Sequence, residues 1–256
     1  MDDLVSIITP SYNTADFISD TINSVINQSY KNWEMIIVDD CSADNTDDVV
    51  AAFCDERIKY FKNEKNSGAA FSRNKALKEA KGRWIAFLDS DDLWTSDKLE
   101  KQITFMKENG YAFSYTNYSE INELSEYSGV LVTGPKHITK TGMYNYCWPG
   151  CLTVMYDFNA VGLIQIEDIR KNNDYAMWLK AIKKADCYLL DENLAMYRKR
   201  KGSISNHSFL RLIKWHYYLY RIAEKKGVLS SALLTLRNLV FGFYKKIKYV
   251  KRRHEL

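Results

Sequence analysis

Short apolar runs alternate with longer amphipathic segments through the first part of the chain. The apolar runs are too short for helices, which predicts buried strands at 4–8, 35–38, 57–61 and 84–88. The segments between them are predicted to be helices, at 15–28, 44–53 and 68–80. Strands that alternate with helices are typical of an α/β fold, in which a mostly parallel central sheet is flanked by helices on both faces.

The pattern is less regular beyond Trp94. A helix at 97–109 and a strand at 111–115 continue the fold, and the polar segment 117–140 is interpreted as a variable excursion with edge strands. Strands are then predicted at 152–156 and 187–190, on either side of a helix with Met177, Trp178, Ala181 and Ile182 on its apolar face. We therefore divide the chain into a main domain, 1–206, and a C-terminal helical appendage, 207–256.

The residues that follow three of the predicted strands carry much of the candidate chemistry. They are Pro10 to Asn13, Asp39 with Asp40, and Asp89 to Asp92. In a parallel sheet, ligands bind beyond the carboxyl ends of the strands. We therefore expect these residues to converge on one crevice.

Acidic residues are concentrated in the stretch WIAFLDSDDLW, Trp84–Trp94. The apolar strand ends directly in Asp89, Ser90, Asp91 and Asp92, and an unpaired buried carboxylate would cost several kcal/mol, roughly. A cation is therefore expected among them, and alternating carboxylates suit Mg²⁺ or Mn²⁺. An acidic turn that caps the next helix is the alternative.

Charge divides the chain into an acidic body and a basic tail. Residues 196–256 hold 16 of the 36 Lys and Arg but two of the 32 Asp and Glu. The five cysteines are an odd, scattered set, which favours reduced thiols in the cytoplasm. The N-terminus shows no secretory signal, and no uncharged run of about 18 apolar residues predicts a membrane-spanning helix.

Four motifs in order and spacing link this sequence to a known family: TPSYN, IIVDDCSADNT, NSGAAFSRNKALKEAKG and WIAFLDSDD. Together they resemble the nucleotide-binding half of the family 2 inverting glycosyltransferases, which have the GT-A fold. The resemblance implies that 1–110 binds a nucleotide sugar and that 111–206 binds the acceptor. It also implies that Tyr12 stacks on the base, worth about 1 to 3 kcal/mol.

The resemblance implies a donor site for a UDP-sugar. Asp39 and Asp40 would accept hydrogen bonds from the base and ribose, which favours uracil, and Asp91 with Asp89 would hold Mn²⁺ or Mg²⁺ on the diphosphate. The other implied donor-binding residues are Pro10, Gly68, Arg73, Asn74 and Ser90. Two alternatives remain: Asp40 caps a helix, or Arg73 is a structural partner of Asp39 or Asp89.

Asp174 lies in the first turn of its predicted helix, where the helix dipole alone favours a carboxylate. The matching acid of family 2 enzymes is the general base, so the resemblance implies that Asp174 takes the proton from the acceptor hydroxyl. Asn173 departs from the more common acidic residue at that position, which puts a carboxylate pair in doubt. An inverting hexosyl transfer needs no covalent intermediate.

Further residues are implied on the acceptor and diphosphate side. Trp148 resembles an acceptor-lining residue that stacks on a sugar, and a core position is the alternative. Arg198, Arg200 and Ser203 match a segment that closes over the diphosphate, although relatives often have histidine where Arg200 stands. A solvated basic loop is the alternative for this segment.

The tail combines aromatic and basic residues at helical spacing, which suits a helix on an anionic membrane. For 208–225 we favour packing on the main domain, and for 229–253 we favour the membrane. A nucleic-acid partner is disfavoured because no nucleic-acid fold signature is present.

The sequence therefore predicts a cytoplasmic glycosyltransferase, peripheral on the inner face of the membrane. It would move sugar from a UDP-sugar to a lipid-linked glycan in cell-surface polysaccharide biosynthesis. One rival, a nucleotidyltransferase, needs a glycine-rich basic loop after the first strand, and TPSYNTAD is neither. The other, a sugar-binding scaffold, is disfavoured by intact Asp91 and Asp174.

Overall fold

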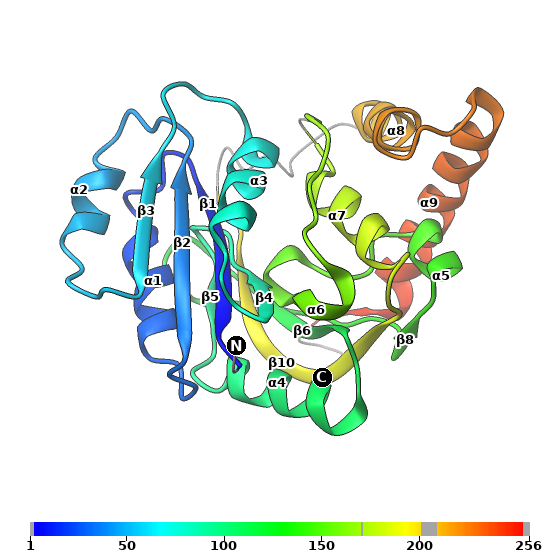
Figure 1. Cartoon of the computed structure of the whole chain (residues 1–256). Helices are drawn as coiled ribbons and strands as arrows, with labels where there is room; N and C mark the ends of the chain where they lie inside the picture. The colour runs from blue at the N-terminus through cyan, green and yellow to red at the C-terminus, as the bar shows by residue number, and fades with distance from the viewer. Residues whose placement is uncertain (1–2, 170, 201–208, 253–256) are drawn as a thin grey trace.

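The computed structural model describes residues 3–169, 171–200 and 209–252 (Figure 1). Its first half alternates strands and helices as the hydrophobic pattern predicts. These elements are β1 (Val5–Ser11), α1 (Ile18–Ile26), β2 (Trp33–Asp39), α2 (Thr46–Ala51), β3 (Ile58–Lys62), α3 (Ala69–Glu79) and β4 (Trp84–Phe87).

The second half has shorter and more varied elements. In chain order they are β5 (Leu93–Trp94), α4 (Lys98–Asn109), β6 (Phe113–Ile121), β7 (Tyr127–Val132), β8 (His137–Ile138), α5 (Lys140–Asn145), the 3₁₀ turn η1 (Cys151–Thr153), β9 (Met155–Asp157), α6 (Phe158–Val161), α7 (Asn173–Ala181) and β10 (Cys187–Arg198). The tail contains α8 (Phe209–Tyr218), a short π-helix (Leu219–Ala223), α9 (Val228–Lys248) and β11 (Val250–Arg252).

One sheet runs through the molecule, and its two halves differ in strand direction. In the first half, β3, β2, β1 and β4 are adjacent in that order and all parallel. In the second half, β9 pairs antiparallel with β4 and β6, and β7 pairs antiparallel with β6. The mixed α/β fold is confirmed, with the parallel pairing concentrated in the first half.

Helices cover both faces of the parallel half. Ile8, Ile36 and Phe87 point into a core shared with α3 and α7. Their neighbours Ile7 and Ile37 point into the opposite core, shared with α1 and α4. Strands buried on both faces need apolar residues at successive positions, which explains their unbroken hydrophobic runs.

Several predicted strands have different bounds in the structure. The strand predicted at 111–115 is β6, which continues to Ile121. The segment predicted as a strand at 152–156 begins as the turn η1, and β9 starts at Met155. The strand predicted at 187–190 extends to Arg198, because β10 pairs parallel with β6 and also antiparallel with β5 and β8. Register shifts interrupt its pairing with β6 near Asn193, so the apolar alternation breaks there.

The tail packs on the main domain. β11 adds an antiparallel strand beside β7, and the amide of Thr133 donates to the carbonyl of Tyr249 at 2.8 Å. Helix α9 approaches closely at Gly242, where a Cβ atom would lie 2.9 Å from the Tyr146 ring. Within the described residues, no helix combines the length and apolar character that crossing a bilayer requires.

Candidate active site

The carboxyl ends of the parallel strands meet at one edge of the sheet. Strand β1 lies between β2 and β4, with Ser11 opposite Asp39 and Ile8 opposite Phe87. The acids that follow β2 and β4 therefore flank the end of β1 on its two sides. This is the convergence that the sequence pattern predicts.

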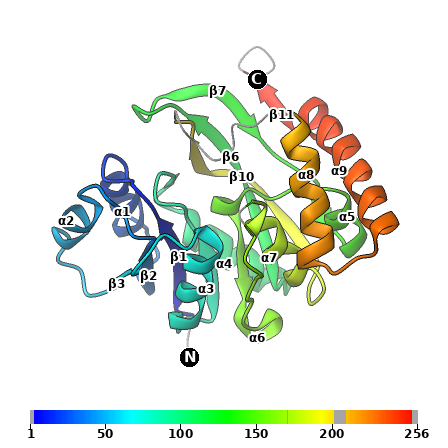
Figure 2. The same cartoon turned by 90° about the horizontal axis from the view of Figure 1, so that it is seen from above.

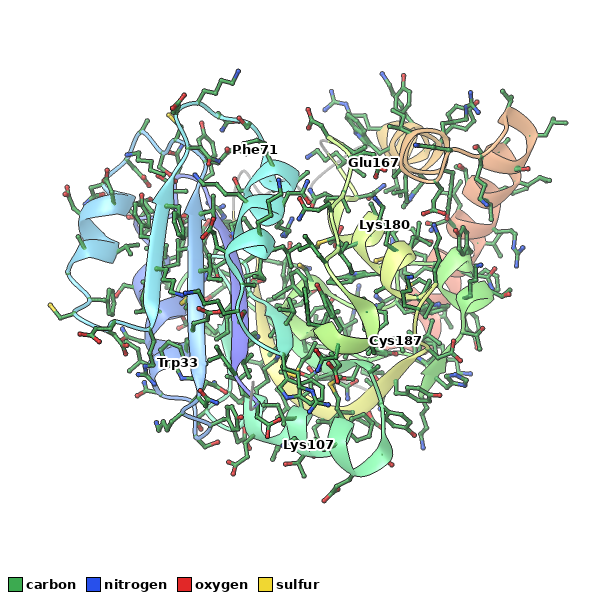
Figure 3. The ribbon with its side chains drawn as sticks, in the orientation of Figure 1. Trp33, Phe71, Lys107, Glu167, Lys180 and Cys187 are labelled. Atoms are coloured by element: carbon green, nitrogen blue, oxygen red, sulfur yellow. The ribbon has the colours of Figure 1, made fainter. Side chains whose placement is uncertain are left out.

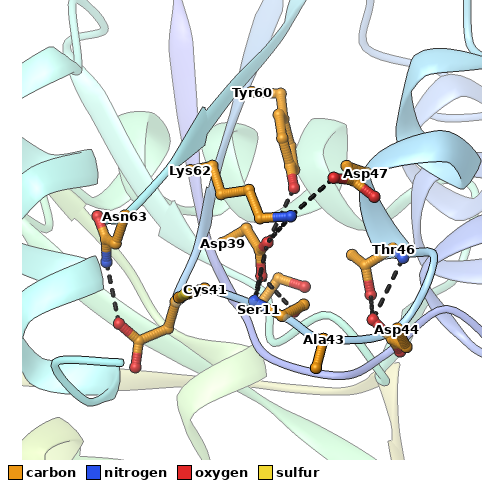
Figure 4. Close-up of polar contacts among 12 residues, drawn as sticks. Ser11, Asp39, Cys41, Ala43, Asp44, Thr46, Asp47, Tyr60, Lys62 and Asn63 are labelled. Atoms are coloured by element: carbon orange, nitrogen blue, oxygen red, sulfur yellow. Dashed lines mark hydrogen bonds and ion pairs between the residues drawn. The ribbon is translucent and has the colours of Figure 1, made fainter. Parts of the chain in front are cut away.

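Asp39 is fully buried, and its carboxylate is held by neighbouring side chains (Figure 4). It accepts hydrogen bonds from the Ser42 hydroxyl, from the Ser42 amide at 3.2 Å and from the Tyr60 hydroxyl at 2.9 Å. The Lys62 ammonium lies 4.0 Å away. The predicted contact of Asp39 with a base therefore competes with bonds that the protein already makes.

Asp40 fixes the turn before α3. Its carboxylate accepts from the Asn63 side chain at 3.0 Å, from the Ser67 amide at 2.9 Å and from the Gly68 amide at 2.6 Å. Gly68 has φ of +88°, a backbone conformation that favours glycine. With Asp40 only 3% exposed, these contacts correspond to the helix-cap alternative, at the start of α3.

Three other predicted donor residues surround the strand ends. Tyr12 directly follows β1 and is 46% exposed, so its ring is available for stacking. Pro10 is buried within β1, and Ser90 is buried between the two candidate metal ligands. Of these three residues, Tyr12 has the exposure that contact with a ligand requires.

Arg73 joins the acids after β4 to the start of α7. Its guanidinium makes an ion pair with Asp89 and donates to the side-chain oxygen of Asn173. Arg73 is 5% exposed, and its Nε has no hydrogen-bond partner among the described residues. The arginine thus bridges two segments that are 100 residues apart in sequence.

A core contact packs α7 against β4, close to the segments that carry Asp89 and Asp174. The rings of Phe87 and Trp178 meet edge to face with centroids 4.9 Å apart. Asp89 lies two residues beyond Phe87, about 6.6 Å along an extended chain. Asp174 lies four residues before Trp178, about 6 Å along the helix axis. The contacts of Arg73 with Asp89 and with Asn173, the residue before Asp174, place both acids on the same side of this contact.

The charges at this centre influence one another. Burial raises the pKa of Asp174, and the positive charge of Arg73 opposes that rise. Burial disfavours the charge of Arg73, but the nearby Asp89 and Asp174 outweigh it and hold the pKa of Arg73 above its ordinary value. The chain therefore assembles an acid, a cation and a second acid within electrostatic reach.

Two arginines hold the acidic turn after β4. Arg198 is 1% exposed, its Nε donates to the Asp91 carbonyl at 2.8 Å, and its amide donates to the Asp92 carboxylate at 2.9 Å. Arg200 pairs with the Asp91 carboxylate at 2.6 Å. The guanidinium of Arg198 is therefore already bonded within the protein, which argues against its predicted contact with the diphosphate. Arg200 instead pairs with Asp91, the predicted metal ligand.

Asp89 and Asp91 fit a divalent ion that is held largely by substrate. Their side chains are 30% and 19% exposed, and Mg²⁺ usually takes one or two carboxylates together with water and phosphate oxygens. No group of three or more His, Cys, Asp or Glu is placed to hold a metal within the described ranges. The donor set thus suits an ion completed by a diphosphate, and not a cage made of protein alone.

The segment before α7 is anchored from both sides. Asn74 exchanges two hydrogen bonds with the backbone of Ile166, at 2.7 and 2.9 Å. From α7, Lys180 donates to the Gln165 carbonyl at 2.6 Å and pairs with Glu167 (Figure 3). Asn74, predicted to bind the donor, is thus occupied in positioning this segment.

Trp148 lies in an aromatic cluster beside α9. It is 4% exposed, its Nε1 donates to the Gly142 carbonyl at 2.9 Å, and its ring contacts Tyr146 and Phe241. These contacts favour the core alternative over stacking on a sugar. Ser203, the remaining predicted residue, lies outside the described residues.

Sequence reasoning missed Lys245, which α9 brings to the backbone of Trp148. Its Nζ donates to the Trp148 carbonyl at 2.8 Å, and burial lowers the pKa of Lys245 to about 8, an effect that the charges of Cys147 and Asp174 oppose. Lys246 and Lys248 stand beside it in the sequence and are exposed. No signal in the sequence distinguishes the buried lysine from its neighbours.

A parallel half-sheet with an exposed aromatic and paired acids at its edge, faced by a further acid from a helix of the second half, is the arrangement of a GT-A glycosyltransferase. The family comparison makes this specific. The family model described as Glycosyl transferase family 2 matches residues 6–160, and the chain belongs to that family.

Curated relatives agree with this assignment. The chain is 46% identical over 225 residues to a protein of Bacillus subtilis named as the putative teichuronic acid biosynthesis glycosyltransferase TuaG, covering 87% of this chain and 89% of TuaG. It is 44% identical over 215 residues to Escherichia coli WfgD, covering 83% and 84%. WfgD is named as a UDP-Glc:alpha-D-GlcNAc-diphosphoundecaprenol beta-1,3-glucosyltransferase.

Solved structures share the fold at lower identity. Residues 1–349 of S. aureus TarS, crystallised with UDP-GlcNAc, superpose with a TM-score of 0.73 and 21% identity, covering 94% of this chain and 73% of that one. Mannosyltransferase PcManGT from Pyrobaculum calidifontis, solved with GDP-Man and Mn²⁺, gives a TM-score of 0.65 and 14% identity, covering 95% and 74%. Both comparisons support the fold.

Proposed function

We propose that this glycosyltransferase transfers a sugar from a UDP-sugar to a lipid-linked glycan acceptor, with inversion at the anomeric carbon. The reaction would serve cell-surface polysaccharide biosynthesis at the inner face of the membrane. The donor-binding role falls to the strand-end edge, and the acceptor role to the region around α7.

One observation carries this proposal: Arg73 contacts Asp89 and Asn173 together. The predicted metal-binding turn and the predicted base are thereby joined through a single buried side chain. A sugar nucleotide held at Asp89 and Asp91 would then present its anomeric carbon toward α7. The same contact argues against a non-catalytic sugar-binding scaffold, because such a protein would not need a metal-binding turn beside a catalytic base.

Asp174 is the general base of the proposed reaction. It accepts the proton of the acceptor hydroxyl as that oxygen attacks the anomeric carbon, and the bond to UDP breaks on the opposite face. Burial raises the pKa of Asp174, which strengthens it as a base, while Arg73 favours its ionised form. No acid other than Asp174 needs to contact the sugar.

The donor is recognised by groups from both halves of the site. Tyr12 stacks on the uracil. The Nε of Arg73, which has no partner in the described part of the chain, donates to a phosphate or sugar oxygen. Asp89 and Asp91 hold Mg²⁺ or Mn²⁺, which neutralises charge on the leaving diphosphate when bound. When the donor binds, the guanidinium of Arg200 leaves the carboxylate of Asp91 and contacts the diphosphate instead.

The acceptor class is proposed from the relatives. WfgD, whose name specifies a diphosphoundecaprenol-linked sugar, shares 44% identity with this chain. A polyprenyl acceptor stays in the membrane, so the enzyme has to work at its surface. The basic tail, which packs beside the acceptor half, supplies a membrane contact.

The proposal is tested with Asp174→Asn. We expect transfer from UDP-glucose or UDP-GlcNAc to GlcNAc-diphosphoundecaprenol to fall by about 10²- to 10⁴-fold, because the base is removed while the shape of the side chain is kept. UDP affinity, measured by calorimetry with Mn²⁺, should stay close to that of the wild-type protein.

Asp168→Asn provides a matched control. Asp168 is an exposed acid six residues earlier in the same acceptor-side segment, and its loss should leave the transfer rate unchanged. Full-rate transfer by the Asp174 variant would rule out this base assignment. Inactivity of the wild-type protein with every UDP-sugar tried would rule out the donor class.

A further inference from the structure

Helix α9 turns its polar side toward the protein. Its buried residues are Ser231, Thr235, Asn238 and Lys245, all polar. They are satisfied within the fold: the Asn238 amide donates to the Tyr175 hydroxyl at 3.3 Å, and Lys245 donates to the Trp148 carbonyl. A surface helix of a globular protein normally buries its apolar side. In α9 the fully buried positions are polar, although the half-buried Leu234 and Phe241 also pack against the core.

The apolar side of α9 faces outward as a continuous stripe, which we call the outer ridge. Its members repeat at intervals of three and four residues, so they form one row about 27 Å long. Each is between 59% and 80% exposed: Leu229, Leu233, Leu236, Val240, Phe243 and Ile247. Half of the large apolar side chains that are exposed in the described residues lie on this helix. A patch of this kind marks an interaction surface.

Positive charge borders the outer ridge. Arg237 and Lys248 lie along one edge of α9 and Lys246 along the other, all exposed, and Lys251 follows in β11. The sole acid between residues 209 and 252 is Glu224. Its side chain is 2% exposed and pairs with Lys183. The surface around the ridge is therefore apolar in the middle and cationic at its edges.

This charge distribution favours an anionic bilayer over a second copy of the chain as the partner of the outer ridge. A second copy that paired its own ridge with this one would bring two cationic borders together, which is unfavourable. An anionic bilayer instead complements the border, and long Lys and Arg side chains reach headgroups while their stems lie over apolar groups. A lipid surface satisfies both the apolar row and the charges.

We propose that the outer ridge of α9 is a membrane-docking surface, with the helix lying in the plane of an anionic bilayer and the ridge side chains among the upper acyl chains. The helix binds in the interface without crossing the membrane. Cations close to the surface strengthen this binding, and salt weakens their contribution.

Docking by this face places the acceptor half of the enzyme beside the lipid. Figure 2 shows α9 on the side of the molecule away from β3 and α2, and α7 lies between α9 and α3. The inner face of α9 contacts Tyr175, the neighbour of Asp174. The inference deepens the proposed function, since a lipid-linked acceptor would enter from this side, but membrane binding can be measured without any substrate.

The test uses the full chain and phosphatidylcholine vesicles with or without phosphatidylglycerol. In sedimentation, the wild-type protein should bind the anionic vesicles, and binding should weaken as salt is raised. The double variant Leu233→Gln with Phe243→Gln should bind these vesicles at least roughly tenfold more weakly than the wild-type protein, because two large apolar groups no longer enter the lipid. Its melting temperature should match that of the wild-type protein, since both positions are exposed.

A matched control replaces exposed apolar groups outside the tail. The variant Leu124→Gln with Tyr127→Gln should leave vesicle binding unchanged, because these exposed residues lie outside the outer ridge. Leu124 is in the turn between β6 and β7, and Tyr127 is the first residue of β7. Equal binding of the ridge variant and the wild-type protein would overturn the proposal. So would a wild-type dimer that dissociates in the ridge variant. Vesicle binding without any sugar transfer would overturn the proposed function alone.

Discussion

Two pairs of aspartates lie at neighbouring strand ends, and the protein surrounds them differently. Asp39 and Asp40, after β2, are 0% and 3% exposed and accept hydrogen bonds mainly from neutral side chains and backbone amides. Asp89 and Asp91, after β4, have partly exposed side chains and pair with Arg73 and Arg200. The same residue type at the same edge of the sheet thus has two environments.

The difference teaches which acids are able to take a ligand. A carboxylate with several neutral donors around it is fixed in place, and a ligand would have to displace all of them. A partly exposed carboxylate paired with an arginine retains free lone pairs and exchanges one cation for another at little cost. Position at a strand end selects candidates, and the donors around each acid decide its role.

Among the tests of this contrast between the two pairs, the largest effect is expected from Asp91→Asn. Because one of two proposed metal ligands loses its charge, the transfer rate should fall by about 10²- to 10³-fold. Added Mn²⁺ should also no longer raise the melting temperature of the UDP-bound protein. Without metal, the free energy of unfolding should change by less than about 1 kcal/mol, since the ion pair with Arg200 is partly exposed. If Mn²⁺ still raised the melting temperature of the UDP-bound variant, Asp91 would not be the metal-binding acid that its partly exposed environment indicates.

The next effect concerns folding. Asp40→Asn replaces one carboxylate oxygen by an amide group that cannot accept from the Ser67 and Gly68 amides together. We expect the free energy of unfolding, measured in urea, to fall by about 3 kcal/mol. The control is Asp47→Asn, an exposed partner of Lys62, which should leave the urea midpoint close to that of the wild-type protein. If the Asp40→Asn variant kept normal stability but lost UDP binding, Asp40 would be a ligand-binding acid like Asp91.

The smallest effect is expected from Ser42→Ala. The variant removes the hydroxyl that donates to Asp39 but keeps the backbone amide and the Tyr60 hydroxyl as donors. The cost should be about 1 kcal/mol, seen as a lower melting temperature, with a transfer rate close to that of the wild-type protein. A large loss of rate at unchanged stability would show that the Asp39 cluster serves the reaction directly.

Much of the fold could be predicted because local pattern determines it. Apolar runs too short for helices specify the four parallel strands, and the acids that follow β2 and β4 are visible in the sequence. The first turn of α7, with Asp174, was also readable from helical spacing. The later strands were harder, because β10 continues past its apolar start through pairing with distant strands.

For the candidate site, the sequence identifies the acids at the strand ends but not the groups that surround them. Arg198 looked like a phosphate ligand, but its guanidinium is buried against the acidic turn. Asn74 looked like a donor contact and instead holds the backbone of Ile166. These roles depend on which groups lie opposite in space, and residues more than 90 apart in sequence supply those groups.

The sequence by itself determined the element types, the acids at the strand ends and the amphipathic spacing of the tail. Only the tertiary structure decided which acids are satisfied and which face of α9 is turned inward. Helical periodicity shows that two faces differ, but not which one meets the protein. Here Tyr175 and the carbonyl of Trp148 offer partners to the polar face, so that face packs and the apolar ridge is left outside.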